Sequence, residues 1–266
     1  MGKTKQLKSL NLAAIFIAFF SLLILISITL KLINVFQRST FDGQNHFTIN
    51  LVGEANNVTF LSLAPSNNQI YILKVDDVKG KNLKRFLQIP LNSEIHTNRE
   101  VRDSNVKNVF LAFLNPFDAK KTNLTYIDLI RLWLFVNSVP TSSIYQQEIS
   151  ASDDILAIRS TGVYSYFIDA KIVEEKASVE IINGTNVFGL GNKLASFLSN
   201  IGVNVVMVST SEKEETKSRI NYFGKENYTV KRLSDLLKFK TQMTTTRGLG
   251  DVTIVIGKDA LKNLEF

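Results

Sequence analysis

The stretch "SVEIINGTNVFGLGNKLASFLSNIGVNVVMVS", Ser178 to Ser209, contains the pattern that decides the fold of the C-terminal part of this chain. "SVEII" has the composition of a strand, and "VNVVMVS", from Val203, has that of a buried strand. Between them a helix from about Phe188 to Ile201 is predicted, and Gly202 would end it. Its apolar residues recur at helical spacing on one stripe: Leu190, Leu194, Phe197, Leu198 and Ile201.

Three glycines in "NGTNVFGLGN" raise the question of a phosphate-binding loop. A Walker loop needs a lysine directly after its second glycine, but Leu190 follows Gly189. A dinucleotide fingerprint needs a third glycine three residues after Gly191, and that position is Leu194. The sequence therefore excludes both nucleotide motifs.

We interpret Asn183, Gly184 and Thr185 as a tight turn. Gly189 and Gly191 would then let the helix start close against the sheet. A weak anion site at the helix N-terminus remains the alternative for this segment.

The rest of the C-terminal part repeats the same pattern. "SRINYF" predicts a strand, and Thr229 is the expected cap of a second helix. The apolar stripe of that helix is Val230, Leu233, Leu236 and Leu237. "DVTIVIG", from Asp251, predicts the last strand. The order β-α-β-β-α-β over residues 178–262 favours a small two-layer split βαβ domain, with a small doubly wound sheet as the second choice.

An uncharged apolar run occupies the N-terminal part, from Leu12 to Leu30. Its 19 residues would span roughly 28 Å as a helix, close to the ~30 Å hydrocarbon core of a bilayer. A cleaved signal peptide is the competing interpretation, but its apolar region is usually shorter. We predict a signal anchor. Lys3, Lys5 and Lys8 would hold residues 1–11 in the cytoplasm, although Lys31 and Arg38 weaken that orientation.

The composition narrows the remaining classes of function. The chain has 266 residues, a net charge of +7 and no cysteine. The missing cysteines exclude disulfides, thiolate nucleophiles and cysteine metal sites. The basic balance favours an anionic partner, but no predicted helix groups its basic residues as a DNA-recognition helix does. We therefore expect no nucleic-acid partner.

The middle of the chain predicts a mixed α/β domain over residues 47–168. Residues 31–46 are expected to be a tether, and residues 169–177 a charged linker. Short β-rich runs predict strands that begin at Phe47, Val58, Gln69, Ile144 and Val163. Residues 123–137 predict a buried helix, with apolar residues at Ile127, Ile130 and Leu134 and others nearly all round.

The C-terminal residues resemble the LytR C-terminal domain of bacterial envelope proteins. The resemblance rests on "ASVEIINGTNVFGLGNKLASFLSNIGVNVVMVS", "INYF" and "LGDVTIVIGKD", and it covers Ser178 to Leu261. Upstream, "INLVGEANNVTFLSLAPSNNQIYILKVDD" resembles the opening of a LytR-CpsA-Psr phosphotransferase domain. This second resemblance implies transfer of a glycan from a polyprenyl-pyrophosphate lipid to the cell wall, with arginines for the pyrophosphate and acidic residues for a divalent ion.

The sequence departs from that phosphotransferase pattern at its catalytic motifs. "ANNVT", Ala55 to Thr59, replaces the expected Arg-Ser-Asp-Thr, and "KVDD" replaces Pro-Arg-Asp, so only Asp76 or Asp77 could serve. The arginines of this region are scattered: Arg85, Arg99, Arg102, Arg131 and Arg159. We expect a degenerate domain without a cofactor, and Mg²⁺ would be needed only if the transferase activity persisted.

Other candidate sites are weaker. The acidic pairs Asp76-Asp77 and Asp153-Asp154 could bind a metal but are more typical of solvated loops, and we expect no metal site. His46 and His96 are the only histidines, so no Ser-His-Asp triad is predicted. A weak patch for an anionic wall polymer would comprise Lys231, Arg232, Lys238, Lys240 and Arg247.

These observations predict a single-pass membrane protein of the bacterial cell envelope, with both domains outside the cytoplasm. We expect a binding or assembly module in cell-wall biogenesis, with the bilayer, an anionic wall polymer or other envelope proteins as partners. The alternative is a divergent phosphotransferase that attaches lipid-linked glycan to the wall.

Overall fold

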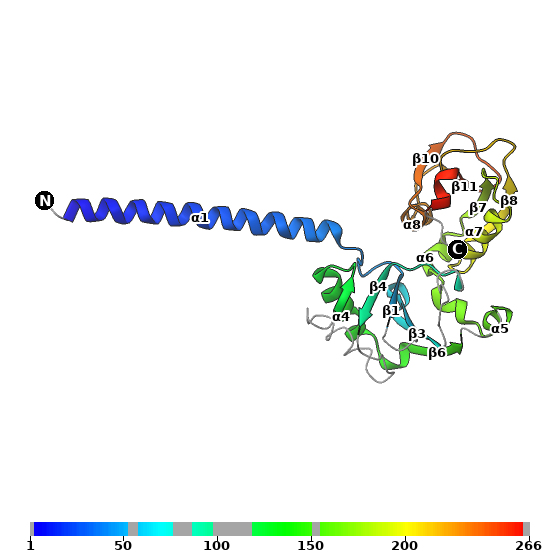
Figure 1. Cartoon of the computed structure of the whole chain (residues 1–266), viewed down its shortest axis with the longest axis horizontal. Helices are drawn as coiled ribbons and strands as arrows, with labels where there is room; N and C mark the ends of the chain where they lie inside the picture. The colour runs from blue at the N-terminus through cyan, green and yellow to red at the C-terminus, as the bar shows by residue number, and fades with distance from the viewer. Residues whose placement is uncertain (1–2, 53–57, 77–86, 98–118, 151–154, 263–266) are drawn as a thin grey trace.

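A computed structural model of the chain describes residues 3–52, 58–76, 87–97, 119–150 and 155–262. One long helix, α1 (Lys3–Arg38), projects away from two folded domains that lie side by side (Figure 1). The mixed α/β class predicted from the sequence is confirmed, with one mixed sheet in each domain.

Helix α1 is longer than the apolar run that predicts it. Residues 31–38, which the sequence analysis assigns to the tether, continue the helix, because Leu32, Ile33, Val35 and Phe36 extend the apolar composition without a glycine or proline. Among the described residues, α1 is the one helix long and apolar enough to cross a membrane, over Ala14–Arg38. The folded domains leave this segment uncovered.

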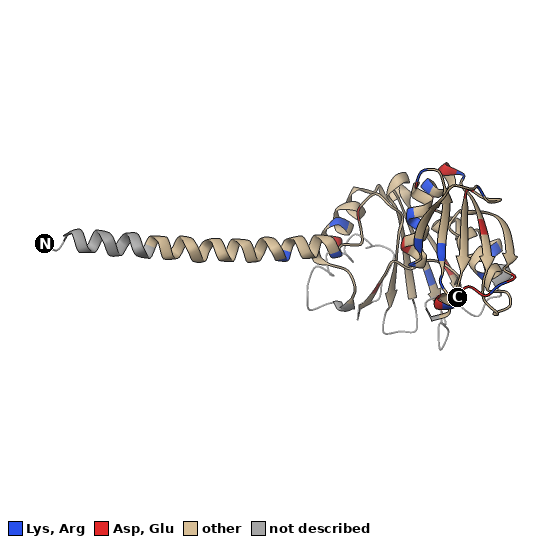
Figure 2. Cartoon of the chain, turned by 90° about the horizontal axis from the view of Figure 1, so that it is seen from above, with Lys and Arg blue, Asp and Glu red and all other residues tan. Residues whose placement is uncertain are grey.

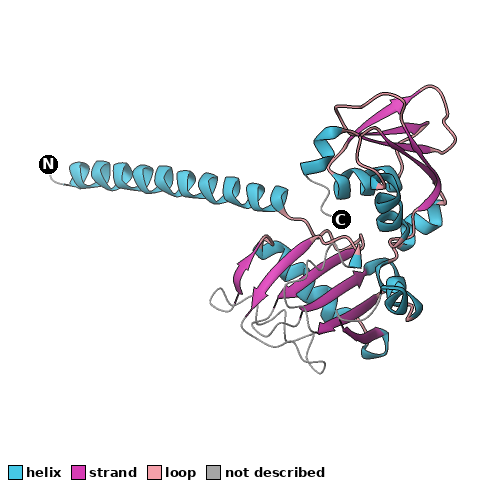
Figure 3. Ribbon diagram, turned by 45° about the vertical axis from the view of Figure 1, so that its right-hand side comes forward, coloured by secondary structure: helices cyan, strands magenta, loops and turns pink. Residues whose placement is uncertain are grey.

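The first domain is built on a six-stranded sheet, seen as magenta arrows in the lower part of Figure 3. Its strands are β1 (Phe47–Val52), β2 (Val58–Ala64), β3 (Gln69–Asp76), β4 (Ser93–Thr97), β5 (Ala119–Thr122) and β6 (Ile144–Ser150). They are arranged in the order β5-β4-β1-β2-β3-β6. β2 pairs antiparallel with β1 and β3, whereas β4 and β6 join by parallel pairing. The predicted strands at residues 47, 58, 69 and 144 are confirmed.

Apolar side chains fill both faces of this sheet. On one face α4 (Tyr126–Ser138) packs Leu129, Leu132 and Val136 against β1, β2 and β3. The other face is covered by α5 (Ile155–Ser160) and η4 (Val163–Phe167). Two short 3₁₀ turns, η1 (Pro65–Asn67) and η3 (Thr141–Ser143), precede β3 and β6. The first domain therefore has three layers.

Two predictions for the first domain are wrong. Residues 163–167 form the 3₁₀ helix η4 and not a strand, because Gly162 enters it in a left-handed conformation and Val163 and Phe167, one turn apart, are both buried. The helix at residues 123–137 begins later, at Tyr126, and is not buried all round. Ile130 and Leu134 are exposed, since the sheet covers only the opposite face of α4.

The C-terminal domain has two layers. Its strands are β7 (Ser178–Asn183), β8 (Asn204–Thr210), β9 (Arg219–Phe223), β10 (Lys240–Thr244) and β11 (Val252–Ile256), in the order β10-β9-β11-β7-β8. Helices α7 (Leu190–Ser199) and α8 (Tyr228–Leu237) share one core with the inner face of the sheet. The short η5 (Lys258–Lys262) follows β11. The apolar stripe predicted for α7 is buried in this core.

The C-terminal domain corrects four details of the sequence analysis. β8 lies at the sheet edge, so Val206 and Met207 are exposed and the strand is not of the buried type. Asn227, and not Thr229, caps α8 through its side chain. β10 was not predicted. Residues 170–175 of the predicted linker form α6 (Ala170–Glu175), which lies between the domains (Figure 1).

Candidate functional site

The side chain of Asn183, the last residue of β7, organises the turn that follows. Its Oδ1 accepts hydrogen bonds from Thr185 N at 3.1 Å and Thr185 Oγ1 at 2.7 Å. Its Nδ2 donates to the carbonyl of Val187 at 2.9 Å, and Thr185 Oγ1 accepts from Val187 N at 3.2 Å. These bonds satisfy the polar groups of Asn183 and Thr185 within the turn, so neither side chain is a free ligand.

The glycines of this segment allow close packing. A Cβ on Gly184 would lie 2.8 Å from the carbonyl oxygen of Ile256, and a Cβ on Gly191 would lie 2.8 Å from Val208 Cγ1. Gly189 has a φ of 75° and precedes α7 in a left-handed conformation, which glycine adopts at least cost. The geometry is that of a tight turn which places α7 directly against β8.

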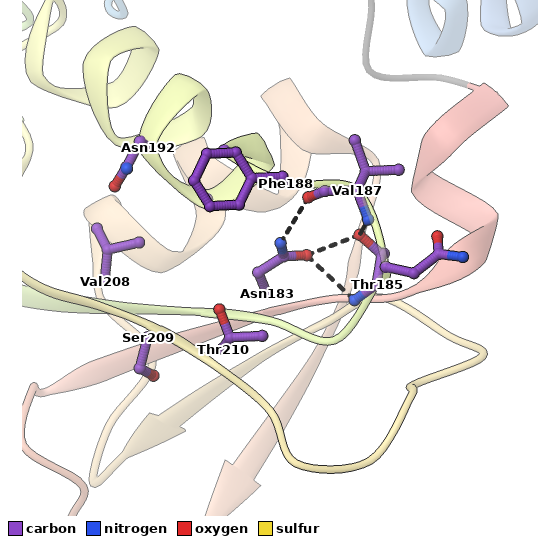
Figure 4. A pocket seen from close by; sticks show the side chains of 11 residues that line it. Asn183, Thr185, Val187, Phe188, Asn192, Val208, Ser209 and Thr210 are labelled. Carbon is purple, nitrogen blue, oxygen red and sulfur yellow. Dashed lines mark hydrogen bonds between the residues drawn. The ribbon is translucent and has the colours of Figure 1, made fainter.

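Beside this turn, a hollow of about 310 Å³ opens between the start of α7 and the edge strand β8 (Figure 4). Its wall alternates polar side chains with apolar ones. The lining residues are Asn183, Thr185, Asn186, Val187, Phe188, Gly189, Gly191, Asn192, Val208, Ser209 and Thr210. Phe188 is 100% exposed, which is unusual for the large apolar surface of a phenylalanine.

The lining of the hollow limits its chemistry. It includes no side chain that can titrate, so it holds no general acid, base or charged phosphate ligand. Asn192 and Thr210 provide an amide and a hydroxyl group that can both donate and accept hydrogen bonds, whereas the side chain of Ser209 points to the other face of β8 (Figure 4). Together with the open ring of Phe188, this set fits an uncharged ligand with several hydroxyl or amide groups.

The terminal segment that carries the family resemblance holds the sheet together. Asp251, just before β11, accepts hydrogen bonds from Ser178 N at 3.0 Å and Ser178 Oγ at 2.8 Å. These bonds, with the nearby Arg247, lower the pKa of Asp251 despite its partial burial. Asp259 accepts in the same way from Ser218 N and Oγ, at 2.8 and 2.6 Å. Both aspartates therefore join strands and are not a catalytic pair.

The predicted basic patch does not form as one surface. Arg232 is buried, with 9% of its surface exposed, and it pairs with Asp169. Arg247 lies 2.6 Å from Asp251. Lys231, Lys238 and Lys240 remain exposed. Lysines and acidic residues are intermixed over this domain (Figure 2), so the field expected from the patch is weak.

Arg232 instead links the two domains. Its Nη2 donates to the carbonyl of His46 at 2.9 Å, and its Nε lies 3.4 Å from Asp169 Oδ2. Asp169 also accepts a hydrogen bond from the hydroxyl of Tyr228 at 2.7 Å. Burial, followed by the hydrogen bond to Asp169 and the charge of this carboxylate, raises the pKa of Tyr228. This cluster could not be predicted from the sequence, because its members are far apart in the chain.

His46 and Ser62 form a contact that sequence reasoning also missed. Ser62 Oγ lies 2.8 Å from His46 Nε2 and donates to the carbonyl of Tyr166, so it accepts from a protonated Nε2. Both side chains are buried. Burial, followed by the charge of Arg232, lowers the pKa of His46 to about 3. An imidazole of such low basicity, with a serine no substrate can reach, is a structural pair and not a nucleophile with its base.

The candidates for phosphotransferase chemistry are not brought together in the described residues. Asp76 ends β3, and Asp77, Arg85, Arg99, Arg102, Asp153 and Asp154 lie outside the described residues. Arg131 is on α4 beside the end of α1, whereas Arg159 is on α5 against Tyr164. These helices occupy opposite ends of the first domain (Figure 1). Within the described ranges, no group of three acidic or histidine side chains could hold a metal ion.

Comparisons with known proteins give one family. Residues 176–259 match the model of the family described as "LytR cell envelope-related transcriptional attenuator". None of the curated proteins matches the chain.

Two solved structures show a distant likeness. The crystal structure of TagT from B. subtilis is 11% identical, over 85% of this chain and 90% of that chain, with a TM-score of 0.19. The X-ray structure of the Lin1025 protein from Listeria innocua is 10% identical, over 83% of this chain and 96% of that chain, with a TM-score of 0.19. Likenesses at this level do not bear on the fold or chemistry of the first domain, whose phosphotransferase resemblance stays a prediction. Residues 176–259 thus match the family of LytR C-terminal domains, as their Asn-Gly-Thr and Asp-Val segments predicted.

Proposed function

We propose that this protein is a non-catalytic, membrane-anchored module of the cell envelope whose C-terminal domain binds an uncharged segment of a wall glycan. The hollow beside Phe188 is the observation that carries the proposal. The family match supports the envelope assignment, since the family is described as cell envelope-related.

The lining of the hollow favours a glycan over a charged polymer. A sugar ring presents an apolar face of C–H groups, which can pack on the open ring of Phe188, and a rim of hydroxyls, which both donate and accept hydrogen bonds. Asn192 and Thr210 offer matching groups. An anionic polymer would find no cation in the lining. In the predicted basic patch, Arg232 and Arg247 are already paired with Asp169 and Asp251.

Anchoring is supported by α1. Its segment Ala14–Arg38 has the length and composition of a membrane-spanning helix, and the folded domains do not cover it. Lys3, Lys5 and Lys8 precede the apolar run, and such residues favour the cytoplasmic side. Both folded domains would then lie outside the cytoplasm. Protease added to intact spheroplasts should digest them, and protection of the C-terminal domain would refute this topology.

Glycan binding is tested with the full chain in lipid nanodiscs. We expect a tetramer of N-acetylglucosamine to bind, and Phe188→Ala to weaken binding at least about tenfold, or about 1.4 kcal/mol. Isothermal titration measures both. Phe223→Ala is the matched control, because Phe223 is also an exposed phenylalanine of this domain but does not line the hollow. Equal loss in both variants, or no binding by the wild-type protein, would count against the proposal.

A further inference from the structure

We propose that the exposed face of α4 rests on the interfacial region of the lipid bilayer, so that the first domain lies against the membrane surface. The proposal depends on the part of the proposed function that places α1 in the bilayer. Within the described part of the chain, no other element covers this apolar helix face, and we name the bilayer as its occupant.

The exposed face of α4 is apolar along its length. Tyr126, Ile130 and Leu134 are 61%, 47% and 54% exposed. They are spaced by four residues, so they lie on one side of the helix. Trp133 borders this face: it is partly buried, with its indole nitrogen turned into the domain and its ring packed against the core. A face of this composition, with one tyrosine and one tryptophan, is typical of segments at the membrane–water interface.

Hydrogen bonds hold α4 at the point where α1 ends. Asp128 Oδ1 accepts from Ser39 Oγ, Thr40 N and Phe41 N, at 2.7, 2.8 and 2.8 Å. Its other oxygen accepts from Thr125, which completes a capping box. The side chain of Asp128 is therefore fully used in joining the start of α4 to the three residues that follow α1.

Arg131 makes a second connection between the two helices. Its Nη1 donates to Ser39 Oγ at 3.1 Å and to the carbonyl of Phe41 at 3.0 Å. Its guanidinium also lies over the ring of Phe36, 5.6 Å from the ring centre, where the cation is attracted to the ring face. Leu134 is three residues from Arg131 on the same helix, so the exposed apolar face of α4 lies next to this contact.

The length of α1 places this junction at the surface of a bilayer. Its candidate span has 25 residues. As a helix this span is roughly 37 Å long, which exceeds a hydrocarbon core of about 30 Å by about 7 Å. The last turns of α1 would therefore reach the headgroup region. Leu32, Ile33 and Phe36 are exposed there. In Figure 1, α4 is at the side of the first domain from which α1 projects.

The charges around the junction complement an anionic lipid surface. Lys31 and Arg38 are exposed on the last turns of α1, and Arg131 is on α4. The one acidic residue of α4, Asp128, is buried. Asp42, in the segment after α1, is exposed and accepts hydrogen bonds from Gln44 and Asn45. Basic side chains beside a membrane segment are attracted to anionic headgroups. A membrane surface can therefore bury the exposed apolar face of α4 and also attract the basic residues beside it.

The single tryptophan of the chain provides a direct test. The full chain is reconstituted in vesicles of phosphatidylcholine and phosphatidylglycerol with brominated acyl chains, and the fluorescence of Trp133 is measured. We expect bromine to quench this emission. The double variant Ile130→Asn/Leu134→Asn should lower the quenching at least about twofold, because it removes the apolar contact that holds α4 at the interface.

A matched control separates contact by α4 from a general effect of polar substitutions. Met243 and Leu249 are comparably exposed in the C-terminal domain, so Met243→Asn/Leu249→Asn should leave the quenching unchanged. Alkaline extraction tests independently whether α1 is inserted in the bilayer. A chain that resists extraction but shows no quenching would overturn the α4 inference and leave the anchor intact. A chain released by alkali would overturn both.

A second copy of the chain is the other occupant to exclude. It would shield Trp133 from an aqueous quencher to a degree that rises with the protein-to-lipid ratio, without quenching by bromine. That outcome would also overturn the inference.

Discussion

His46 touches both domains through different atoms. Its ring Nε2 lies 2.8 Å from Ser62 Oγ in the first domain, and its carbonyl oxygen accepts from Arg232 Nη2 of the second. Burial, followed by the charge of Arg232, lowers the pKa of His46 from 6.5 to about 3. The imidazole is therefore neutral at physiological pH, and it can keep its place between the domains without a counter-charge.

This environment predicts a dependence of stability on pH. Between pH 6.5 and 3 the unfolded chain protonates His46 while the folded chain does not. The stability that His46 contributes is therefore complete above about pH 6.5. Below this pH, the free energy of unfolding should fall by about 1.4 kcal/mol for each pH unit. Thermal unfolding between pH 7.5 and 5 measures the slope. The variant His46→Gln should lose this part of it.

Between pH 7.5 and 5, the carboxylates with lowered pKa values do not contribute to this slope. Burial opposes ionisation of Asp128, but hydrogen bonds from Ser39, Phe41 and Thr125 lower its pKa overall. The pKa of Glu215 is also lowered, chiefly by its hydrogen bond to Arg219. Because these carboxylates start from ordinary pKa values of 3.8 and 4.5, their stabilisation is lost only at lower pH. If the free energy of unfolding of His46→Gln still fell with the wild-type slope above pH 5, His46 would not be the source of the pH dependence.

At the scale of elements, the turn between β7 and α7 depends on Gly184. An added Cβ would lie 2.6 Å from Glu215 Cβ and 2.8 Å from the carbonyl oxygen of Ile256. The second neighbour is backbone at the end of β11, which cannot move without disturbing the sheet. The turn, the loop at residue 215 and β11 therefore pack at one point.

Gly184→Ala should lower the free energy of unfolding by about 1–3 kcal/mol, as overpacking of a filled interior does. Thermal or denaturant unfolding of the full chain measures the loss. Asn186, two residues away, is exposed. Asn186→Ala should therefore change stability by no more than about 0.5 kcal/mol. Equal stability of the two variants would show that the turn can relax around a methyl group.

The elements that could be predicted from sequence are those whose own residues settle the structure. The stripe of α7 from Leu190 to Ile201 indicates both the helix and its buried face. By contrast, Val206 and Met207 have the composition of a buried strand, and only the sheet order, which places β8 at the edge, shows that they are exposed. The same limit applies to Ile130 and Leu134 on α4.

The candidate site was predictable only in part, for the same reason. The segment from Asn183 to Gly191 could be interpreted as a turn, because asparagine and glycine adopt turn conformations locally. The hollow could not be predicted, since Val208 and Thr210 enter it from another strand. Arg232 was expected on the surface. Its partners Asp169 and His46 are distant in sequence, and only the packing of the domains brings them together.

At the scale of the whole molecule, Arg232 and α6 connect the domains. Ile172 of α6 belongs to the core of the C-terminal domain. Glu175, at the end of α6, accepts hydrogen bonds from Tyr228 N at 2.8 Å and Thr229 N at 2.7 Å. These bonds satisfy donors in the first turn of α8 that have no partner within the helix. The segment between the domains is therefore a packed element and not a loose linker.

Arg232→Met should weaken the connection between the domains. It leaves the buried Asp169 without its cation, a change that costs about 3–5 kcal/mol when the charge stays buried. Calorimetry of the full chain should then show a second unfolding transition. Lys231→Met, the exposed neighbour on α8, should show none. If Asp169→Asn in the same chain restores no stability, the ion pair is not the source of the loss.

The hydrogen bonds made by residues 39–46 limit how far the C-terminal domain can move away from α1. This segment is tied to α4 by Asp128 at one end and to Arg232 by His46 at the other. With α1 embedded in the bilayer, the hollow beside Phe188 would stay at a nearly constant height above the lipid. Lateral diffusion would then carry it only through a thin layer parallel to the membrane. If the hollow binds glycan as proposed, strands of polymer beyond that layer would be out of reach, and the protein would contact only the wall material closest to the membrane.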